Sequence, residues 1–395
     1  MSTDFSLDFI CQALKSVLSP INDRIPLHEP KFGGREWDYV KECLDTGWVS
    51  SVGKFVDQFE HDLVEFTGAK YAVAVVNGTA ALHISLLLCG VRADDEVLTP
   101  ALSFVATANA ISYCGAVPHF IEVEEKSLGV APGCLAHHLG KTAEMRSGEC
   151  FNRETGRRIR AIIPMHTFGH PVDIEPLLEV CSSFNIEVIE DAAESLGSFY
   201  KGKHTGLFGR VAALSFNGNK TITTGGGGAL LTNDESIARL GKHLTTTAKT
   251  SHPWEFNHDM VGYNYRMPNL NAAVGCAQLE QLDRFLSSQR RWANQYRHIF
   301  KGISGVKFVD EPKYAHSNFW LNALLLDKDN AVHRDALLRQ TNAAGIMTRP
   351  VWTLMTKLPM YSKCPRMNLE VAEDLERRLV NIPSSSSIGE TLGNA

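Results

Sequence analysis

Short runs of β-branched and apolar residues alternate with helical patterns between about residue 70 and residue 235. The connecting segments, among them ATANAISYCG and VDIEPLLEVCSSF, have the three-and-four spacing of helices with one apolar face. This alternation predicts an α/β fold, with a mostly parallel sheet between two layers of helices. The expected strands are YAVAVV (71–76), EVLTP (96–100), VPHFIEV (117–123), IRAIIPM (159–165), IEVIED (186–191) and VAALSF (211–216), with GALLTND (228–234) as a candidate for the last.

The rest of the chain divides around this region. Residues 1–27 are expected to form a helical extension, and residues 28–268 a large domain. Residues 269–395 are expected to supply a linking helix and a small C-terminal α+β domain. We expect that helix to run unbroken from Asn269 to Ile303, because the segment contains no proline and its apolar positions keep a helical period. Further on, NFWLNALLLD predicts a strand and VHRDALLRQTNAAG a helix. The polar stretch from Lys141 to Arg160 reads as a solvated loop.

Charge and cysteine content exclude several classes of function. The 395 residues carry a formal net charge of −5 with no basic run, so nucleic acid is not expected as a partner. Nine cysteines occur without a C-x-x-C pair, which argues against a disulfide framework or a metal site and favours the reducing cytoplasm. The most apolar segment, 71–91, is interrupted by polar residues at 77–79 and 83, so we expect no membrane span.

Polar residues follow directly after three of the predicted strands, where ligands of α/β sheets bind. Asn77, Gly78 and Thr79 open a helix whose free N–H groups suit a phosphate, although a plain turn has the same sequence. The segment 190–194 (EDAAE) places carboxylates after the next of these strands, and acids are also common helix caps there.

The third strand end carries a lysine in a permissive backbone. VAALSF leads into Asn217, Gly218, Asn219 and Lys220, and four glycines follow at 225–228. The glycines fit neither G-x-G-x-x-G nor a P-loop, which argues against nucleoside triphosphates and nicotinamide cofactors. A lysine for an aldehyde, a carboxylate for a pyridinium nitrogen and a helix start for a phosphate are together what pyridoxal 5′-phosphate requires.

Three segments in order, EDAAESLGS, FNGNK-x-ITTGGGG and GYNYRM, resemble the DegT/DnrJ/EryC1/StrS family of nucleotide-sugar aminotransferases. The likeness runs from IPLHEPKFGG to the RPVW loop, and it is greatest to members of the legionaminic acid and bacillosamine pathways. It implies a fold-type-I pyridoxal phosphate enzyme that acts as a homodimer in bacterial surface-sugar biosynthesis.

The resemblance also implies the cofactor site. Lys220 would form the Schiff base with the cofactor and move protons, and Asp191 would pair with the pyridine nitrogen. Glu194 would lie near the ring hydroxyl. Phe104 would stack on the ring, while Gly78, Thr79 and Ser215 would hold the phosphate. Asn264, in GYNYRM, would reach the phosphate from the neighbouring subunit.

A second group would line the sugar-nucleotide pocket. It comprises Trp48, Val49, Ser50, His166, Asn219, Arg349 and Trp352. For Trp48 and Trp352 a role in the core is an equal alternative, and His166 could be a structural hydrogen-bonding residue.

The resemblance implies transfer of the amino group of L-glutamate to the C4 ketone of a UDP-linked 4-keto-6-deoxy-N-acetylhexosamine. The alternative is the same chemistry on a GDP- or dTDP-linked ketosugar, of the perosamine or 3-amino-sugar type. The sequence leaves open the nucleotide, the stereochemistry of the product amine and the role of the N-terminal extension, for which packing against a partner subunit is one hypothesis. A pyridoxal-phosphate-binding regulator is disfavoured because no segment is free to form a DNA-binding module.

Overall fold

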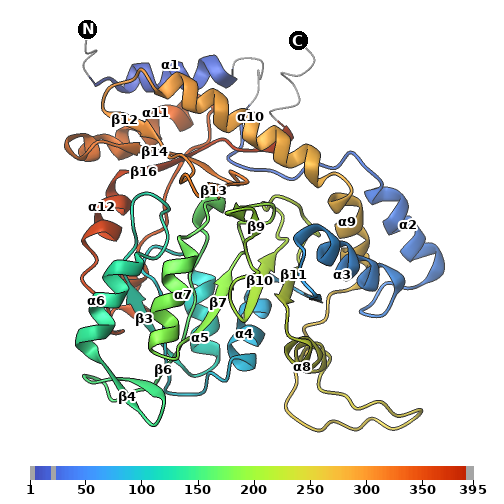
Figure 1. Cartoon of the computed structure of the whole chain (residues 1–395). Helices are drawn as coiled ribbons and strands as arrows, with labels where there is room; N and C mark the ends of the chain where they lie inside the picture. Colours follow the sequence, from blue (N-terminus) through green and yellow to red (C-terminus); the bar gives the residue numbers. More distant parts are fainter. Residues whose placement is uncertain (1–4, 19–23, 388–395) are drawn as a thin grey trace.

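The computed structural model describes residues 5–18 and 24–387 (Figure 1). Its α-helices are α1 Leu7–Leu18, α2 Glu36–Thr46, α3 Lys54–Thr67, α4 Gly78–Leu88, α5 Val105–Tyr113, α6 Pro132–Thr142, α7 Ile174–Ser183, α8 Glu235–Thr245, α9 Asn269–Leu279, α10 Leu282–Phe300, α11 Arg334–Ala343 and α12 Glu370–Arg378. Its strands are β1 Tyr71–Val75, β2 Glu96–Pro100, β3 Val117–Ile121, β4 Ala143–Arg146, β5 Glu149–Asn152, β6 Ile159–Ile162, β7 Glu187–Asp191, β8 Phe199–Tyr200, β9 Lys203–His204, β10 Val211–Ser215, β11 Gly228–Thr232, β12 Val306–Phe308, β13 Ala315–His316, β14 Asn322–Leu326, β15 Arg349–Pro350 and β16 Leu379–Ile382.

The predicted strands between residues 70 and 235 form one seven-stranded sheet, in the order β1-β11-β10-β7-β6-β2-β3. β10, β7, β6, β2 and β3 pair in parallel, whereas β11 runs antiparallel to both of its neighbours. The expectation of a mostly parallel sheet is therefore confirmed. GALLTND supplies the one reversed strand, β11, which lies between β1 and β10.

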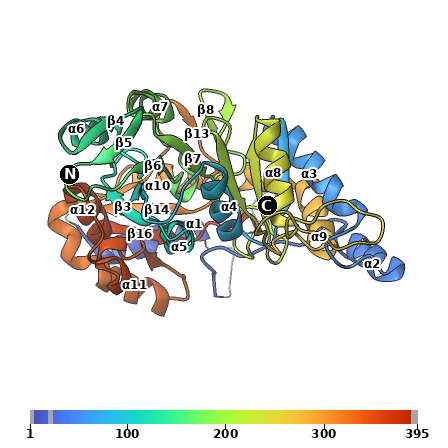
Figure 2. The same ribbon diagram turned by 90° about the horizontal axis from the view of Figure 1, so that it is seen from below.

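Both faces of this sheet are buried by helices, as its continuous apolar runs require. On one face, side chains such as Val75, Ile189 and Leu230 pack with those of α4, α5 and α8. The opposite face packs against α3 and α9 at one end and against α6 and α7 at the other. Figure 2 shows α2, α3 and α9 together at one end of the molecule and α11 and α12 at the other.

A smaller antiparallel sheet, in the order β12-β14-β16-β15, follows in the C-terminal part. The predicted strand in NFWLNALLLD is β14, and the predicted helix after it is α11. α1 packs on α10 and α11, where Ile10, Leu14 and Leu18 join a cluster with Trp292 and Tyr296 (Figure 1). The buried face of α1 therefore packs against its own chain, and contact of the extension with a partner subunit stays a prediction. Residues 1–4 and 19–23 of the predicted extension lie outside the described residues.

The single helix expected over Asn269–Ile303 was wrong, because the chain forms two helices, α9 and α10. Gln281 interrupts the pattern: its side chain donates to the Ala277 carbonyl at 2.8 Å and to Glu36 Oε1 at 2.7 Å. Its backbone N–H bonds instead to the carbonyl of Gln278, which tightens the turn. The break lets α9 pack on α2 and α3, and α10 on the C-terminal sheet. The boundaries proposed at residues 27 and 268 stay predictions.

The solvated loop expected over Lys141–Arg160 was also wrong. This segment contains the β4–β5 hairpin, and its turn residues Ser147 and Gly148 both have positive φ, at 51° and 83°. A two-residue turn with both φ values positive matches the twist of paired strands. Within residues 5–18 and 24–387, every helix is too short or too polar to cross a lipid bilayer.

Candidate active site

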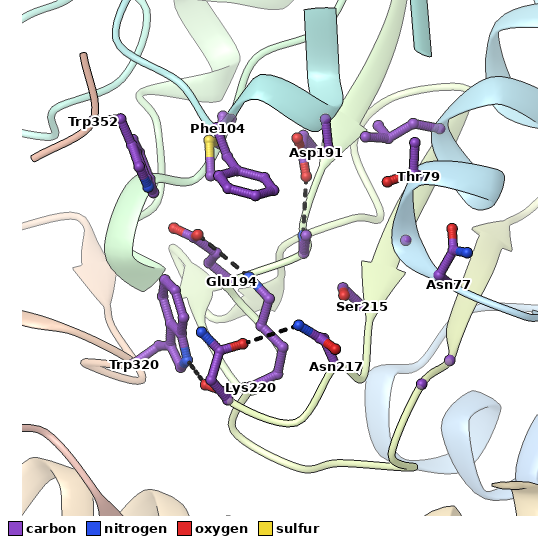
Figure 3. A pocket seen from close by; sticks show the side chains of 18 residues that line it. Asn77, Thr79, Phe104, Asp191, Glu194, Ser215, Asn217, Lys220, Trp320 and Trp352 are labelled. Atoms are coloured by element: carbon purple, nitrogen blue, oxygen red, sulfur yellow. Dashed lines mark hydrogen bonds and ion pairs between the residues drawn. The ribbon is translucent and has the colours of Figure 1, made fainter. Parts of the chain in front are cut away.

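A cavity of about 220 Å³ lies where β1, β7 and β10 end (Figure 3). The side chains expected after these strands converge on it, as the rule for open α/β sheets predicts. The cavity is lined by seven of the eight predicted cofactor residues, Gly78, Thr79, Phe104, Asp191, Glu194, Ser215 and Lys220, and by two predicted substrate residues, Asn219 and Trp352.

The first turn of α4 forms one wall. Asn77 caps this helix by accepting a hydrogen bond from Ala80 N at 2.8 Å, which leaves the other N–H groups of the turn for a ligand. Gly78 is needed here because a Cβ would lie 2.8 Å from Ser215 Cβ. The helix start and the end of β10 therefore approach closely, with Thr79 and Ser215 beside them. Such a turn suits a phosphate group.

Asp191 ends β7 and is almost completely buried. Its Oδ2 accepts a hydrogen bond from Thr107 Oγ1 at 2.6 Å, and its Oδ1 accepts one from Ala193 N at 3.2 Å. Burial raises the pKa of this carboxyl above its ordinary value, since these two bonds do not offset the loss of water. A cation placed against Asp191 would favour its ionised form.

Lys220 reaches into the cavity from the loop after β10. Its Nζ lies 3.4 Å from Glu194 Oε1, and the other Glu194 oxygen accepts a hydrogen bond from Phe168 N at 2.9 Å. Burial raises the pKa of Glu194 to about 7, despite the opposing effect of Lys220. The indole ring of Trp320 also faces Lys220, with its centroid 4.1 Å from Nζ (Figure 3).

His166 does not line the cavity. It is fully buried, and its Nε2 lies 3.0 Å from Glu190 Oε2 while its Nδ1 accepts a hydrogen bond from Val172 N at 3.2 Å. Burial acts to raise the pKa of Glu190. The bonds from His166 and from the N–H groups of Gly206 and Gly209 outweigh it and leave that pKa below its ordinary value. This geometry matches the structural alternative for His166.

The remaining predicted residues lie outside the cavity of the single chain. Trp48, Val49 and Ser50 precede α3 and are joined to Asn269, whose Nδ2 donates to Trp48 O and whose N donates to Ser50 O. Arg349 is exposed on β15 and donates to Asn342 and Thr348. Asn264 is exposed beside Thr246 and Arg266 in a separate surface pocket.

Sequence reasoning missed several residues of the cavity wall. The sequence places Trp320 only in a predicted strand, yet this residue contacts Lys220 from 100 positions away along the chain. It places Asn217 only in the lysine loop and Met165 only in a strand. Asn77, which the sequence does place at the start of the phosphate-binding helix, is the helix cap.

The family model for DegT/DnrJ/EryC1/StrS aminotransferases matches residues 30–391. The chain belongs to this family. Relatives of this aminotransferase include GDP-perosamine synthases of three bacteria, among them that of Escherichia coli O157:H7, which is 38% identical over 92% of this chain and 94% of its own. EpsN of Bacillus subtilis, described as a pyridoxal phosphate-dependent aminotransferase, is 35% identical over 94% of this chain and 93% of its own. The crystal structure of the aminotransferase TlmJ from Streptoalloteichus hindustanus superposes with a TM-score of 0.82 at 27% identity, covering 93% of this chain and 96% of that one.

The aminotransferase is thus a pyridoxal phosphate-dependent sugar aminotransferase with the fold-type-I architecture. Its cavity fits that cofactor on independent grounds. The Gly78 cradle has no room for a Cβ, and the carboxyl of Asp191 is buried with its pKa raised, although Lys220 acts to lower that pKa. The relatives favour the GDP-linked alternative over the UDP-linked substrate that the sequence resemblance implied.

Proposed function

We propose that this enzyme transfers the amino group of L-glutamate to the C4 ketone of a GDP-linked 4-keto-6-deoxyhexose. The observation that carries the proposal is the 38% identity, over nearly the whole chain, to a GDP-perosamine synthase. The cavity supports the reaction class, because it brings a lysine, two buried carboxyl groups and a helix start to one place.

Two groups of residues would hold the cofactor. The N–H groups of Gly78 and Thr79, with Ser215, would bind its phosphate, and Phe104 would cover one face of its ring. Asp191 would face the pyridine nitrogen, where an ion pair would offset the cost of burying the carboxylate. When bound, pyridoxal phosphate supplies an electron sink and a carbon atom to which amines attach reversibly.

Lys220 would bind the cofactor covalently and then act as a free amine. In that form its Nζ would accept the α-proton of glutamate as a general base and would later give up a proton as a general acid. Glu194 Oε1, 3.4 Å from Nζ, is placed to exchange protons with that amine. With a pKa of about 7, Glu194 can take up or release a proton near neutral pH.

We also propose that the active unit is a homodimer with shared sites. Asn264 is exposed and lies outside the cavity of its own chain, which is consistent with a role in the partner's site. Large apolar side chains are exposed nearby in sequence, with Trp254, Phe256 and Val261 each about four-fifths accessible. Burying such side chains against a second copy would be favourable.

The test is amino transfer to three ketosugars by the purified enzyme. GDP-4-keto-6-deoxymannose, UDP-4-keto-6-deoxy-N-acetylglucosamine and dTDP-4-keto-6-deoxyglucose are each supplied with glutamate, and the 4-amino product and 2-oxoglutarate are quantified. We expect the highest kcat/KM with the GDP-linked sugar and no turnover by Lys220→Ala. A higher kcat/KM for the UDP- or dTDP-linked sugar would overturn the substrate assignment, and turnover by Lys220→Ala would overturn the role of the lysine.

A further inference from the structure

The amine of Lys220 contacts two side chains from different parts of the chain. Glu194 Oε1 is 3.4 Å from Nζ, and the centroid of the Trp320 ring is 4.1 Å from it (Figure 3). A cation at this distance from an aromatic face is attracted by the ring quadrupole, and more strongly where water is excluded. Trp320 is itself 3% exposed, so the contact is largely shielded from solvent.

The orientation of the Trp320 ring is fixed by two hydrogen bonds. Its Nε1 donates to the carbonyl of Asn219 at 2.6 Å, and its backbone N donates to Asn318 Oδ1 at 2.8 Å. Asn219 directly precedes Lys220, so the indole is bonded to the backbone that carries the lysine. Trp320 therefore keeps its place relative to Lys220 even when the lysine side chain moves.

The side chain of Asn318 links Glu194 to Trp320. Its Nδ2 donates to the carbonyls of Glu194 and Leu196, at 2.9 Å each, while its Oδ1 accepts from Trp320 N. The two groups that contact the lysine amine are thus joined through one buried amide. His28, which packs near Trp320, does not add a competing charge, because burial lowers its pKa to about 3.

We propose that Trp320 is a positioning residue for Lys220, whose indole face holds the ammonium group whenever the lysine is not bonded to the cofactor. The inference rests on the proposed role of Lys220. A lysine displaced from the cofactor is no longer held at both ends and regains side-chain freedom, yet it must stay close to the reacting carbon to move the next proton. The indole face and Glu194 give the released amine a defined resting position.

The test measures how readily an added amine displaces Lys220 from the cofactor, without any amino transfer to a sugar. Methoxyamine is titrated into the enzyme loaded with pyridoxal phosphate. Its nitrogen forms a C=N bond to the cofactor carbon, the C=N bond to Lys220 breaks, and Nζ leaves as an amine that takes up protons from solvent. Loss of the visible band of the lysine-bound cofactor gives the displacement constant. Because Trp320→Leu removes the aromatic face, we expect a constant about tenfold less favourable than in the wild type.

Trp320→Phe keeps an aromatic face, so we expect its constant to lie between those of the wild type and Trp320→Leu. Trp37→Leu is the matched control, because Trp37 is an exposed tryptophan of α2 that does not line the cavity, and its constant should match the wild type. If Trp320→Leu does not fold, as judged by thermal unfolding, Trp320→Met replaces it. An unchanged constant in the folded leucine or methionine variant would overturn the inference.

The same experiment separates this inference from the proposed function. If the wild type gives no lysine-bound band, or Lys220→Ala gives the same band, the role of Lys220 fails and the inference with it. If the band requires Lys220 but the displacement constant is indifferent to residue 320, the inference fails alone.

Discussion

Glu194 is a carboxyl group whose surroundings oppose its ionisation. It is buried at the cavity wall, and Lys220 and Phe168 N supply its polar contacts. The sequence motif EDAAES places a carboxylate after β7, but it does not indicate that the carboxylate is desolvated. That property arises from residues distant in the chain that close over it.

The raised pKa of Glu194 gives the first prediction. Its pKa is about 7 in the folded chain against an ordinary value of 4.5. Between pH 4.5 and pH 7 the folded state therefore keeps the proton on Glu194, whereas the unfolded state has lost it. This contribution to stability is complete below about pH 4.5 and falls as pH rises toward 7. Glutamine cannot ionise, so Glu194→Gln should gain in Tm relative to the wild type between pH 5 and pH 8, by on the order of 2 °C.

Thermal unfolding of both cofactor-free proteins across this range checks the prediction. Glu190→Gln is the contrasting variant, since the pKa of Glu190 is lowered and its hydrogen bonds need the carboxylate. A Tm difference for Glu194→Gln that stays constant from pH 5 to pH 8 would contradict the raised pKa.

The Gly78 cradle gives the second prediction. A Cβ at this position would lie 2.8 Å from Ser215 Cβ and would push the start of α4 away from β10. We expect Gly78→Ala to weaken pyridoxal phosphate binding by about tenfold, the effect of a 1.4 kcal/mol loss. Gly133→Ala is the matched control, because Gly133 also lies in the first turn of a helix and a Cβ there meets no atom within 4 Å. Fluorescence titration of the cofactor into both variants gives the comparison, and equal affinities would refute the steric argument.

At the residue scale, the sequence predicted the side chains that follow strands and missed those that arrive from elsewhere. Asp191, Ser215 and Lys220 could be located because the ends of parallel strands lie at one edge of a sheet. Trp320 could not, since a tryptophan in an apolar run is usually a core residue and nothing local links it to position 220. The placement of Asn264 in the partner's site stays a prediction.

Among the secondary-structure elements, helices α9 and α10 show where periodicity alone fails. The apolar positions of 269–303 keep a helical pattern throughout, and no proline or late glycine marks a break. The break depends on Gln281, whose side chain replaces a backbone hydrogen bond and also binds Glu36 in α2. Such a contact between distant segments leaves no signal in a sequence window.

The N-terminal helix α1 gives the third prediction. Leu14 is 1% exposed and packs in a cluster with Trp292 and Tyr296. Leu14→Ala should therefore lower the free energy of unfolding by about 2–5 kcal/mol, the usual cost of such a cavity. Gln12→Ala, on the exposed side of the same helix, should change it by less than about 0.5 kcal/mol. Urea unfolding of the two variants checks this, and similar losses in both would indicate that α1 does not pack as described.

At the scale of the whole molecule, the sheet could be predicted from the sequence and its strand order could not. The strands expected between residues 70 and 235 all form, because continuous apolar runs have few alternatives to a buried sheet. The reversal of β11 depends on the segment 217–227, which carries the chain back from the end of β10 into the position between β10 and β1. That turn also contains Lys220, so the loop that carries the proposed Schiff-base lysine and the reversed strand share one structural cause.

The proposed homodimer gives the fourth prediction. If Asn264 acts in the partner's site, then Lys220→Ala and Asn264→Ala will each lose activity but will complement each other when mixed and allowed to exchange subunits. Random exchange should restore about a quarter of wild-type activity, because half of the dimers are hybrids and each hybrid has one intact site. Light scattering confirms the mass of the mixture. No recovery in a mixture proven to exchange would rule out sites shared in this way.

The position of α1 has a consequence for how the chain is made. This helix leaves the ribosome before α10 and α11, but its docking surface on them is built from residues about 280–340. At synthesis rates of about 5–20 residues per second, the apolar face of α1 stays without its contacts in α10 and α11 for roughly 15–60 seconds. Docking of α1 onto α10 and α11 is therefore a late step of folding. A nascent chain stalled before α10 would expose Ile10, Leu14 and Leu18 to chaperones and proteases.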